Sequence, residues 1–342
     1  MSLYESGDYN SIFNDARILI TGGTGSIGLE LTKALLRHKP RSICLFSNDE
    51  NSLFEARMIF SKYPEVIYKL GDVRDIKSVE RVIKDYDFVF HAAALKHVTF
   101  CEENPYEAIS TNILGTQNMI DCAIKYGIEK FVFVSTDKAV NPISVMGATK
   151  LLGEKLVISA SKLTNKPIFS IVRFGNVLAS RGSVVLIFER QVKEGGPITV
   201  TDPEMTRFVM LPSEAAQLVL RAAEIAKPGE IFVLKMRAVK IGVLAEACKE
   251  FFCKLYGKDE RTIKIAEIGS NVGEKIHEEL MTASEALNAI ETEHFYIINP
   301  HPERAMSSKP YSASREGYSS DKAPSLSKEE IIALLSKLYD TS

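Results

Sequence analysis

A glycine-rich turn near the start of the chain is the first feature that could do chemistry. Gly22–Gly28 (GGTGSIG) follows a short apolar run, Arg17–Thr21, and opens a stretch with helical character. Glycines permit a tight turn and a close approach of the backbone to a phosphate, and a helix N-terminus favours negative charge. The spacing, GxxGxxG, differs by one residue from the general GxGxxG fingerprint. The turn predicts a dinucleotide-binding loop, with contacts from Gly22, Thr24, Gly25, Ser26, Ile27 and Gly28.

The end of the second apolar run indicates which dinucleotide binds. In sites that prefer NAD, an Asp or Glu about 20 residues further on holds the ribose hydroxyls. In that place this chain has Ser47 and Asn48, followed by Asp49. Ser47 and Asn48, at the end of the run, lack the carboxylate that would repel a 2′-phosphate. NADP is therefore the expected cofactor, and Asp49 keeps NAD open as the alternative.

Residues after the third and fourth runs extend the predicted cofactor site. Asp72, which Val73 follows, is a candidate contact for the adenine, whereas Arg74 is interpreted as a surface charge. Small side chains follow the fourth run, where a cofactor could lie against the backbone: Ala92, Ala93 and Ala94.

These candidates lie at the ends of alternating elements. Strands are expected at 17–21, 42–47, 66–70, 88–92, 130–135 and 168–173, with helices between them at 29–37, 76–84 and 112–126. Such alternation predicts a parallel sheet covered on both faces, and the uniformly apolar strands agree with burial on both sides. The expected fold class is α/β, a Rossmann-type doubly wound parallel sheet with a smaller C-terminal substrate-binding lobe.

The alternation breaks after about residue 174, where glycines and prolines become frequent. We expect an NADP-binding domain at 16–175 with return segments from later in the chain, a mainly substrate-binding lobe with the C-terminal helix at 176–342, and a polar extension at 1–15. A helix is expected near 213–225, and an irregular segment at 301–324. Ser327–Glu330 has the pattern of a capping box that opens the last helix.

Composition excludes several classes of function. The chain has 342 residues and a formal net charge of −2, so electrostatics gives no support for a nucleic-acid partner. Its five cysteines show no metal-ligand spacing, and an odd, sparse count suits a reducing compartment better than a disulfide framework. The N-terminus lacks a signal pattern, and no long uncharged apolar stretch predicts a membrane span. We therefore expect a cytoplasmic protein without a metal.

Two segments after the fifth run carry the remaining candidates, and together with other motifs they resemble a known family. They are Ser135–Pro142 (STDKAVNP) and Met146–Lys150 (MGATK). The chain resembles the extended short-chain dehydrogenase/reductases and, more narrowly, the bacterial UDP-N-acetylglucosamine 4,6-dehydratases of polysaccharide and flagellin-sugar pathways. The resemblance covers roughly residues 16–285 and the C-terminal helix, with further motifs HAAALKHV (91–98), RFGNVLASRGSV (173–184), TVTDPEMTRF (199–208) and GEKIHEEL (273–280).

The resemblance implies a reaction and the residues that perform it. The sugar is oxidised at C4, water is eliminated across C5–C6, and the hydride returns to C6. Asp137 and Lys138 would serve as acid and base, Thr136 would bond near the C4 hydroxyl, and Lys150 would contact the cofactor ribose. The UDP-sugar would be held by Lys96, His97, Asn176, Ser183, Thr199, Arg207 and Glu274, with Arg207 on the diphosphate and Glu274 on the uridine ribose. For Arg181, a second anion contact and a solvated loop charge are equally open.

One departure from the family pattern leaves alternatives open. Met146 stands where the superfamily has a catalytic Tyr, and a thioether neither donates nor accepts the proton that a phenol would. A branch of these dehydratases carries Met here, so we expect an active enzyme. The alternatives are a nucleotide-sugar 4-epimerase and a non-catalytic NADP-binding sensor or scaffold, with Asp137 and Lys138 as a loop-edge ion pair. The configuration produced at C5 stays open, and the resemblance implies a homo-oligomer.

Overall fold

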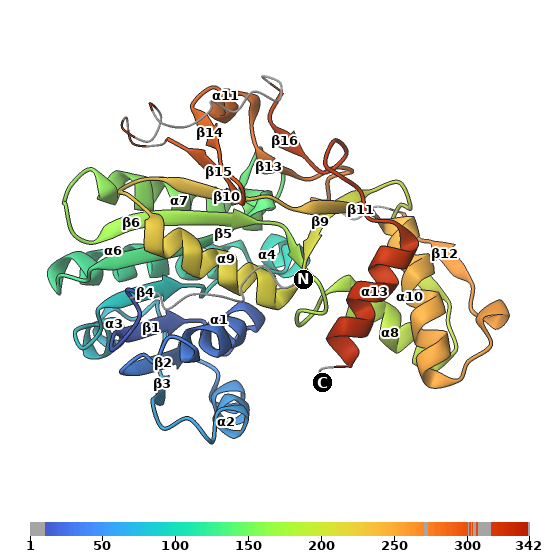
Figure 1. Cartoon of the computed structure of the whole chain (residues 1–342), viewed down its shortest axis with the longest axis horizontal. Coiled ribbons are helices and arrows are strands. Elements are labelled where there is room, and N and C mark those ends of the chain that lie inside the picture. The colour runs from blue at the N-terminus through green and yellow to red at the C-terminus, as the bar shows by residue number, and fades with distance from the viewer. Residues whose placement is uncertain are drawn as a thin grey trace.

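A nine-stranded sheet forms the centre of the computed structural model (Figure 1), which describes residues 11–269, 273–299, 301, 303, 306 and 316–340. From one edge, the order is β3 (Val66–Leu70), β2 (Ser42–Ser47), β1 (Arg17–Thr21), β4 (Phe88–His91), β5 (Lys130–Thr136), β6 (Ile168–Phe174), β10 (Ile231–Leu234), β15 (Phe295–Ile298) and β14 (Ala289–Glu291). The strands from β3 to β10 are parallel, and β15 and β14 are added antiparallel. The chain order reverses between β1 and β4, where doubly wound sheets open a ligand crevice at their carboxyl ends. The expected fold class is confirmed.

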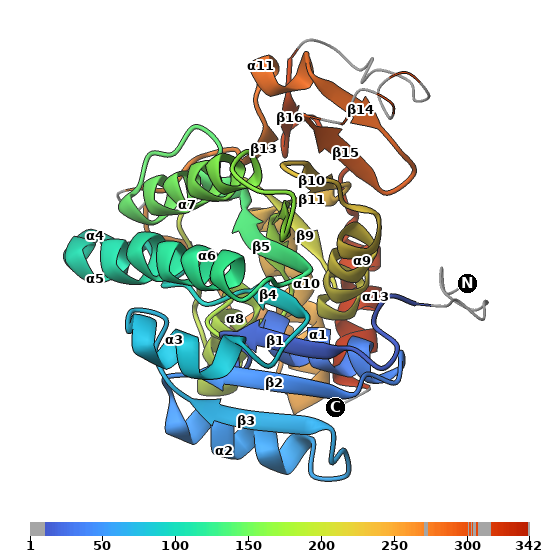
Figure 2. The same cartoon turned by 90° about the vertical axis from the view of Figure 1, so that its left-hand side faces the viewer.

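Helices cover both faces of this sheet (Figure 2). On one side α1 (Ser26–Leu36) packs against α9 (Pro212–Ile225), and on the other α6 (Gly115–Lys125) packs against α3 (Ile76–Ile83) and α7 (Val145–Ser161). The strands between them are apolar because they are buried from both sides. The remaining helices of this half are α2 (Glu50–Ile59), α4 (Val98–Glu103) and α5 (Pro105–Ile109).

The expected strand bounds agree with the structure at β1, β2 and β3, and differ by one residue at β4, β5 and β6. The helix expected at 112–126 is wrong at its start, because a π-helical turn, η1 (Ser110–Leu114), precedes α6. Within this turn the side-chain amide of Asn112 accepts from the Leu95 N–H at 2.8 Å and donates to the Leu95 carbonyl at 3.0 Å. It also donates to the Thr149 hydroxyl at 2.9 Å. The turn therefore attaches the loop after β4 to α7.

A second hydrophobic cluster lies beside the sheet. It joins α8 (Val184–Glu194), β8 (Ile198–Val200), α10 (Ile241–Tyr256) and α13 (Lys328–Tyr339), with η3 (Glu260–Thr262) and β12 (Ile265–Glu267) at its margin. The capping box expected at Ser327–Glu330 is confirmed at the start of α13. All five cysteines are buried free thiols. Within the described residues, no helix is long and apolar enough to cross a bilayer, and no group of side chains has a metal-binding arrangement.

Short strands connect the cluster to the sheet. A three-stranded sheet joins β11 (Arg237–Lys240), β9 (Thr206–Met210) and β7 (Asn176–Val177), and β13 (Glu279–Met281) pairs with β16 (Tyr318–Ser319). The segment expected to be irregular at 301–324 thus contains a strand, and much of the rest of it lies outside the described residues. Two short elements complete this region, η2 (Asp137–Ala139) after β5 and α11 (Ala283–Ala286) after β13.

A buried guanidinium bridges several of these elements. Arg173 at the end of β6 is 1% exposed and bonds both oxygens of Glu154 on α7, at 2.8 and 2.6 Å. It also bonds both oxygens of Glu285 on α11, at 3.0 and 2.8 Å, and the main-chain oxygen of Leu280 on β13 at 3.3 Å. Although burial opposes the charge, the two carboxylates raise the pKa of Arg173 above its usual value. The pairing is fully satisfied, so removal of one partner leaves a buried charge without compensation.

Replacing Arg173 should therefore cost far more stability than replacing an exposed arginine. We expect Arg173→Met to lower the free energy of unfolding by about 3–5 kcal/mol, since Glu154 would stay buried and unpaired. Denaturant unfolding followed by circular dichroism measures this. The matched control is Arg41→Met. Arg41 forms an ion pair with Asp15 in which the two side chains are 61% and 69% exposed, so the pair should contribute at most about 1 kcal/mol to stability. Equal losses in the two variants would contradict the role given to Arg173.

Candidate active site

A cavity of about 270 Å³ lies at the carboxyl ends of β1, β2 and β4. Most of its lining belongs to the residues predicted for the cofactor: Gly22, Ser47, Asn48, Asp72, Val73, Ala93 and Ala94, joined by Phe46, Gly71, Arg74, Leu95, Glu107 and Thr111. Gly22 has a φ of +62°, and a Cβ there would lie 2.8 Å from the Ala93 nitrogen. Only glycine therefore fits where the turn passes the chain after β4.

The glycine turn leads from Gly22, which lines the cavity, into the start of α1. Gly25 is the N-cap residue, and no side chain of the described part caps the helix there, so its first N–H groups are available to a phosphate. A Cβ on Gly28 would lie 2.5 Å from the Gly23 carbonyl oxygen, which holds the helix close to the turn. The Thr24 hydroxyl donates to the Ser47 hydroxyl at 3.1 Å, and Ile27 packs against the hydrophobic core. These residues fit a bound dinucleotide.

The acidic residues near the cavity are engaged by neighbours. Asp49 caps α2 by accepting bonds from the Ser52 N–H at 3.2 Å and its hydroxyl at 2.6 Å, which lower the pKa of Asp49. Asp72 accepts from Asn48 at 3.3 Å and from the Arg74 guanidinium at 2.7 and 2.9 Å. These bonds outweigh the effect of burial and lower the pKa of Asp72. Arg74, interpreted as a surface charge, is exposed as expected, and it also lines the cavity, where it pairs with Asp72 and Glu107.

The loop before α8 crosses to the cofactor turn. The Arg181 N–H donates to the Ser26 hydroxyl at 3.0 Å, and its guanidinium donates to the Ser52 hydroxyl at 3.2 Å. The Lys96 ammonium donates to the Arg181 main-chain oxygen at 2.6 Å. Burial and the nearby Arg181 lower the pKa of Lys96, and burial and Lys96 lower that of His97. Arg181 therefore lies beside the cofactor turn, a position that no local sequence signal indicated.

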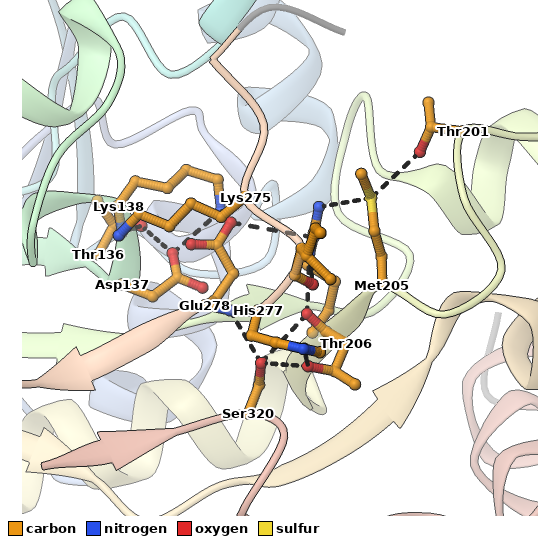
Figure 3. A network of polar contacts seen from close by, with 12 residues as sticks. Thr136, Asp137, Lys138, Thr201, Met205, Thr206, Lys275, His277, Glu278 and Ser320 are labelled. Atoms are coloured by element: carbon orange, nitrogen blue, oxygen red, sulfur yellow. Dashed lines mark hydrogen bonds and ion pairs between the residues drawn. The ribbon is translucent and has the colours of Figure 1, made fainter. Parts of the chain in front are cut away.

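The end of β5 carries a compact acid–base cluster (Figure 3). Asp137 is fully buried, and its Oδ1 accepts from the Thr136 hydroxyl at 2.8 Å and the Lys138 ammonium at 3.0 Å. Its other oxygen, Oδ2, has no hydrogen-bond partner among the residues that the structure describes. The Lys138 side chain keeps 25% exposure. Solvent or a ligand can therefore reach the cluster at the Lys138 side chain, whereas the Asp137 carboxylate is inaccessible to solvent.

A second buried carboxylate faces this cluster, and the sequence analysis did not predict it. Glu278 Oε1 lies 3.3 Å from Lys138 Nζ and 3.9 Å from Arg207 Nε, while Oε2 has no partner in the described part of the chain. Ser320 fixes the main chain of Glu278, because the Ser320 hydroxyl accepts from the Glu278 N–H and the Ser320 N–H donates to the Glu278 carbonyl. Burial opposes the Lys138 charge, but the two carboxylates raise the pKa of Lys138 overall. The only available signal was the GEKIHEEL motif, in which Glu278 is one of three acidic residues.

Met146 and Lys150 lie one helical turn apart on α7. The Lys150 ammonium donates to the Val134 carbonyl at 2.7 Å and lies 4.0 Å from the centre of the Phe133 ring. Burial lowers the pKa of Lys150 to about 8, although Glu154 opposes this. Met146 is buried in a small apolar cluster with Cys101 and Ala108, so it shapes the site without offering a proton-transfer group.

The remaining predicted substrate residues fall into two groups. Arg207 joins the acid–base cluster, and its Nη1 donates to the main-chain oxygens of Thr206 and Ile276, at 2.9 and 3.2 Å. Asn176 opens β7 beside β9, and Glu274 lies on the loop before β13. Ser183 is the N-cap residue of α8, and its buried hydroxyl has no hydrogen-bond partner among the described residues. Thr199, on β8, is set apart from them, because its hydroxyl accepts from the Gln191 amide inside the second hydrophobic cluster.

Known proteins share both the sequence and the fold. Residues 18–300 match the family model described as polysaccharide biosynthesis protein. The chain is 41% identical over 293 residues to a UDP-N-acetylglucosamine 4,6-dehydratase (inverting) of Campylobacter jejuni, with 84% of each chain covered. A UDP-glucose 4-epimerase of Rickettsia canadensis is also 41% identical over 293 residues, with 84% of each chain covered.

A solved structure extends the likeness over nearly the whole chain. The X-ray structure of Pen from Bacillus thuringiensis has a TM-score of 0.88 and 43% sequence identity, and the match covers 95% of this chain and 98% of that one. The sheet order, the glycine turn and the cluster at the end of β5 thus occur within a sequence relationship that spans most of the molecule. This chain belongs to the polysaccharide biosynthesis protein family.

Proposed function

We propose that this protein is an NADP-dependent UDP-N-acetylglucosamine 4,6-dehydratase. The observation that carries the proposal is the ion pair of the buried Asp137 with Lys138 at the end of β5, the strand next to β4, with a carboxylate oxygen that has no partner among the described residues. A buried carboxylate without full hydrogen bonding is costly, and such sites are typical of groups that exchange protons with a ligand. The relatives named dehydratase and epimerase both suit the fold, so the choice depends on this cluster.

Elimination explains the cluster better than epimerisation does. Water loss across C5–C6 needs a base at C5 and an acid for the departing 6-hydroxyl, whereas an epimerase has no such step. Asp137 and Lys138 supply one group of each kind within 3.0 Å of each other. The sensor or scaffold alternative gives this costly arrangement no purpose.

The chain's own residues provide a route for the protons. NADP held at the glycine turn would supply a hydride acceptor for C4 and a hydride donor for C6. The C4 hydroxyl proton passes to Thr136 Oγ1 as the hydroxyl of Thr136 gives its own proton to Asp137 Oδ1, along the 2.8 Å bond that is already in place. Asp137, now protonated, gives that proton to the leaving 6-hydroxyl, which departs as water. Lys138, as the neutral amine, removes the C5 proton, and the ammonium formed in this way returns one proton to C5 at the end. This route needs no phenol, so Met146 is compatible with turnover.

Asp137 and Lys138 are the most direct test of the dehydratase. We expect Asp137→Asn and Lys138→Ala each to lower formation of the 4-keto-6-deoxy product by about 10²–10⁴-fold, the usual contribution of a general acid or base. Product is measured by mass spectrometry after incubation with UDP-N-acetylglucosamine. Both variants should still bind NADP and UDP. Lys155→Ala, at an exposed lysine of α7, is the matched control and should match wild type. Rates within about tenfold of wild type in the first two variants would contradict their roles.

Met146→Leu tests whether the missing phenol matters. Leu is apolar and similar in volume, so the swap in the small cluster with Cys101 should cost less than about 1.5 kcal/mol of stability. We expect kcat to stay within about threefold of wild type, because Met146 transfers no proton. A loss as large as that of Asp137→Asn, with NADP binding intact, would show that the thioether has a role the proposal lacks.

The preference for NADP depends on Arg181. Its guanidinium lies at Ser52, beside Asp49 and the end of β2, where a 2′-phosphate would be expected. Arg181→Ala should weaken NADP binding by about 10–100-fold, the effect of one charge-assisted bond of 1.5–3 kcal/mol. NAD serves as the internal control in the same titration and should change little. Equal weakening of both cofactors would place the guanidinium elsewhere on the dinucleotide.

A further inference from the structure

We propose that Glu278 is a positioning residue that takes a proton from Lys138 and so converts the lysine into the neutral amine that acts as base at C5. The inference rests on the proposed dehydratase function. It addresses a requirement that function leaves open, because an ammonium has no lone pair with which to accept a proton. Figure 3 shows Glu278 on the opposite side of Lys138 from Thr136, within one connected network.

The geometry favours Glu278 over Asp137 as the acceptor. Asp137 Oδ1 already accepts bonds from Thr136 and Lys138, and in the proposed route it must receive the C4 hydroxyl proton. Glu278 Oε1 lies 3.3 Å from the Lys138 nitrogen, and Oε2 has no partner among the described residues. Glu278 is 2% exposed, and Ser320 holds its main chain from both sides, so the carboxylate has a fixed place beside the lysine.

The charges around the pair are consistent with the transfer. Glu278 is faced by Asp137 and Lys138 from η2 and by Arg207 from β9, while the adjacent His277 is directed to the Thr206 hydroxyl, at 2.9 Å. Burial, and then the negative charge of Asp137, raise the pKa of Glu278, which makes it a better proton acceptor than an exposed glutamate. Burial disfavours an ammonium and a carboxylate, so a sugar that covers the exposed quarter of Lys138 should favour the neutral amine and acid.

The protons balance over a full cycle. An N–H bond of Lys138 breaks and an O–H bond of Glu278 forms, so ammonium and carboxylate become amine and acid. The amine then takes the C5 proton and becomes an ammonium again while Glu278 stays protonated. After water has left and C6 has received its hydride, the Lys138 ammonium gives one proton to C5. Transfer from Glu278 back to the amine restores the starting pair.

The test is the pH dependence of Glu278→Gln, which keeps the shape of the side chain and removes the proton acceptor. In this variant Lys138 can lose its proton only to solvent. At pH 7 we expect kcat about 10²-fold below wild type, with the ratio of variant to wild-type kcat rising by up to about tenfold per pH unit toward alkaline pH. Taking the ratio of variant to wild-type kcat at each pH cancels the effect of other titrating groups, such as Lys150, on the measured pH dependence. Glu278→Asp should recover a large part of the rate and the pH dependence of wild type.

Controls separate this inference from the proposed function and from misfolding. Glu279→Gln changes the neighbouring carboxylate, which accepts a bond from the Asn141 amide, and should leave the ratio flat and near one. Thermal unfolding and UDP binding should be similar for all variants. If wild type forms the 4-keto-6-deoxy product but the Glu278→Gln ratio is constant with pH or near one, this inference is overturned alone. If wild type forms no such product, the proposed function falls and the inference with it.

Discussion

The buried contact of Arg173 with two carboxylates joins the elements that carry the proposed catalytic residues. Its fork spans from β6 to Glu154 on α7 and to the main chain of Leu280 on β13. Glu154 lies one helical turn beyond Lys150, and Leu280 lies two residues beyond Glu278. A guanidinium has five donors in a rigid plane, which match two carboxylates and a carbonyl from one fixed position, whereas an ammonium has only three donors.

The same contact reaches the end of β5, because the Ser135 hydroxyl donates to Glu154 at 2.6 Å. The acid–base cluster is therefore supported by a network of residues whose charges are paired, whereas the carboxylates of the cluster itself are not fully hydrogen-bonded. Asp137, Lys138 and Glu278 place two carboxyl groups against one ammonium in a largely buried setting. In such surroundings a small change in solvent access moves protons between neighbours. A proton-transfer site requires rigid supporting residues together with reacting groups whose hydrogen bonds are not all satisfied within the protein.

Local patterns in the sequence were enough to predict the elements and the cofactor turn. Apolar runs mark β1 and β2, a shorter one marks the start of β3, and the glycine spacing between a strand and a helix indicates a dinucleotide-binding turn. Glu278 and Ser320 could not be found in this way, because Ser320 bonds Thr206 across 114 positions and such contacts leave no trace in periodicity. Arg181 was ambiguous for the same reason. The roles of Asp137 and Lys138 came from resemblance, since an adjacent acid and base is in itself an ordinary ion pair.

In the proposed reaction, oxidation at C4 and reduction at C6 occur on the same sugar and are joined by proton transfers through Thr136, Asp137 and Lys138. The most direct test uses UDP-N-acetylglucosamine with deuterium at C4 and follows the label by NMR. We expect a 4-keto-6-deoxy product with the deuterium on the C6 methyl group. Deuterium retained at C4 of an epimerised sugar would contradict the proposal and identify an epimerase, and unchanged substrate would show that the protein does not turn over this sugar.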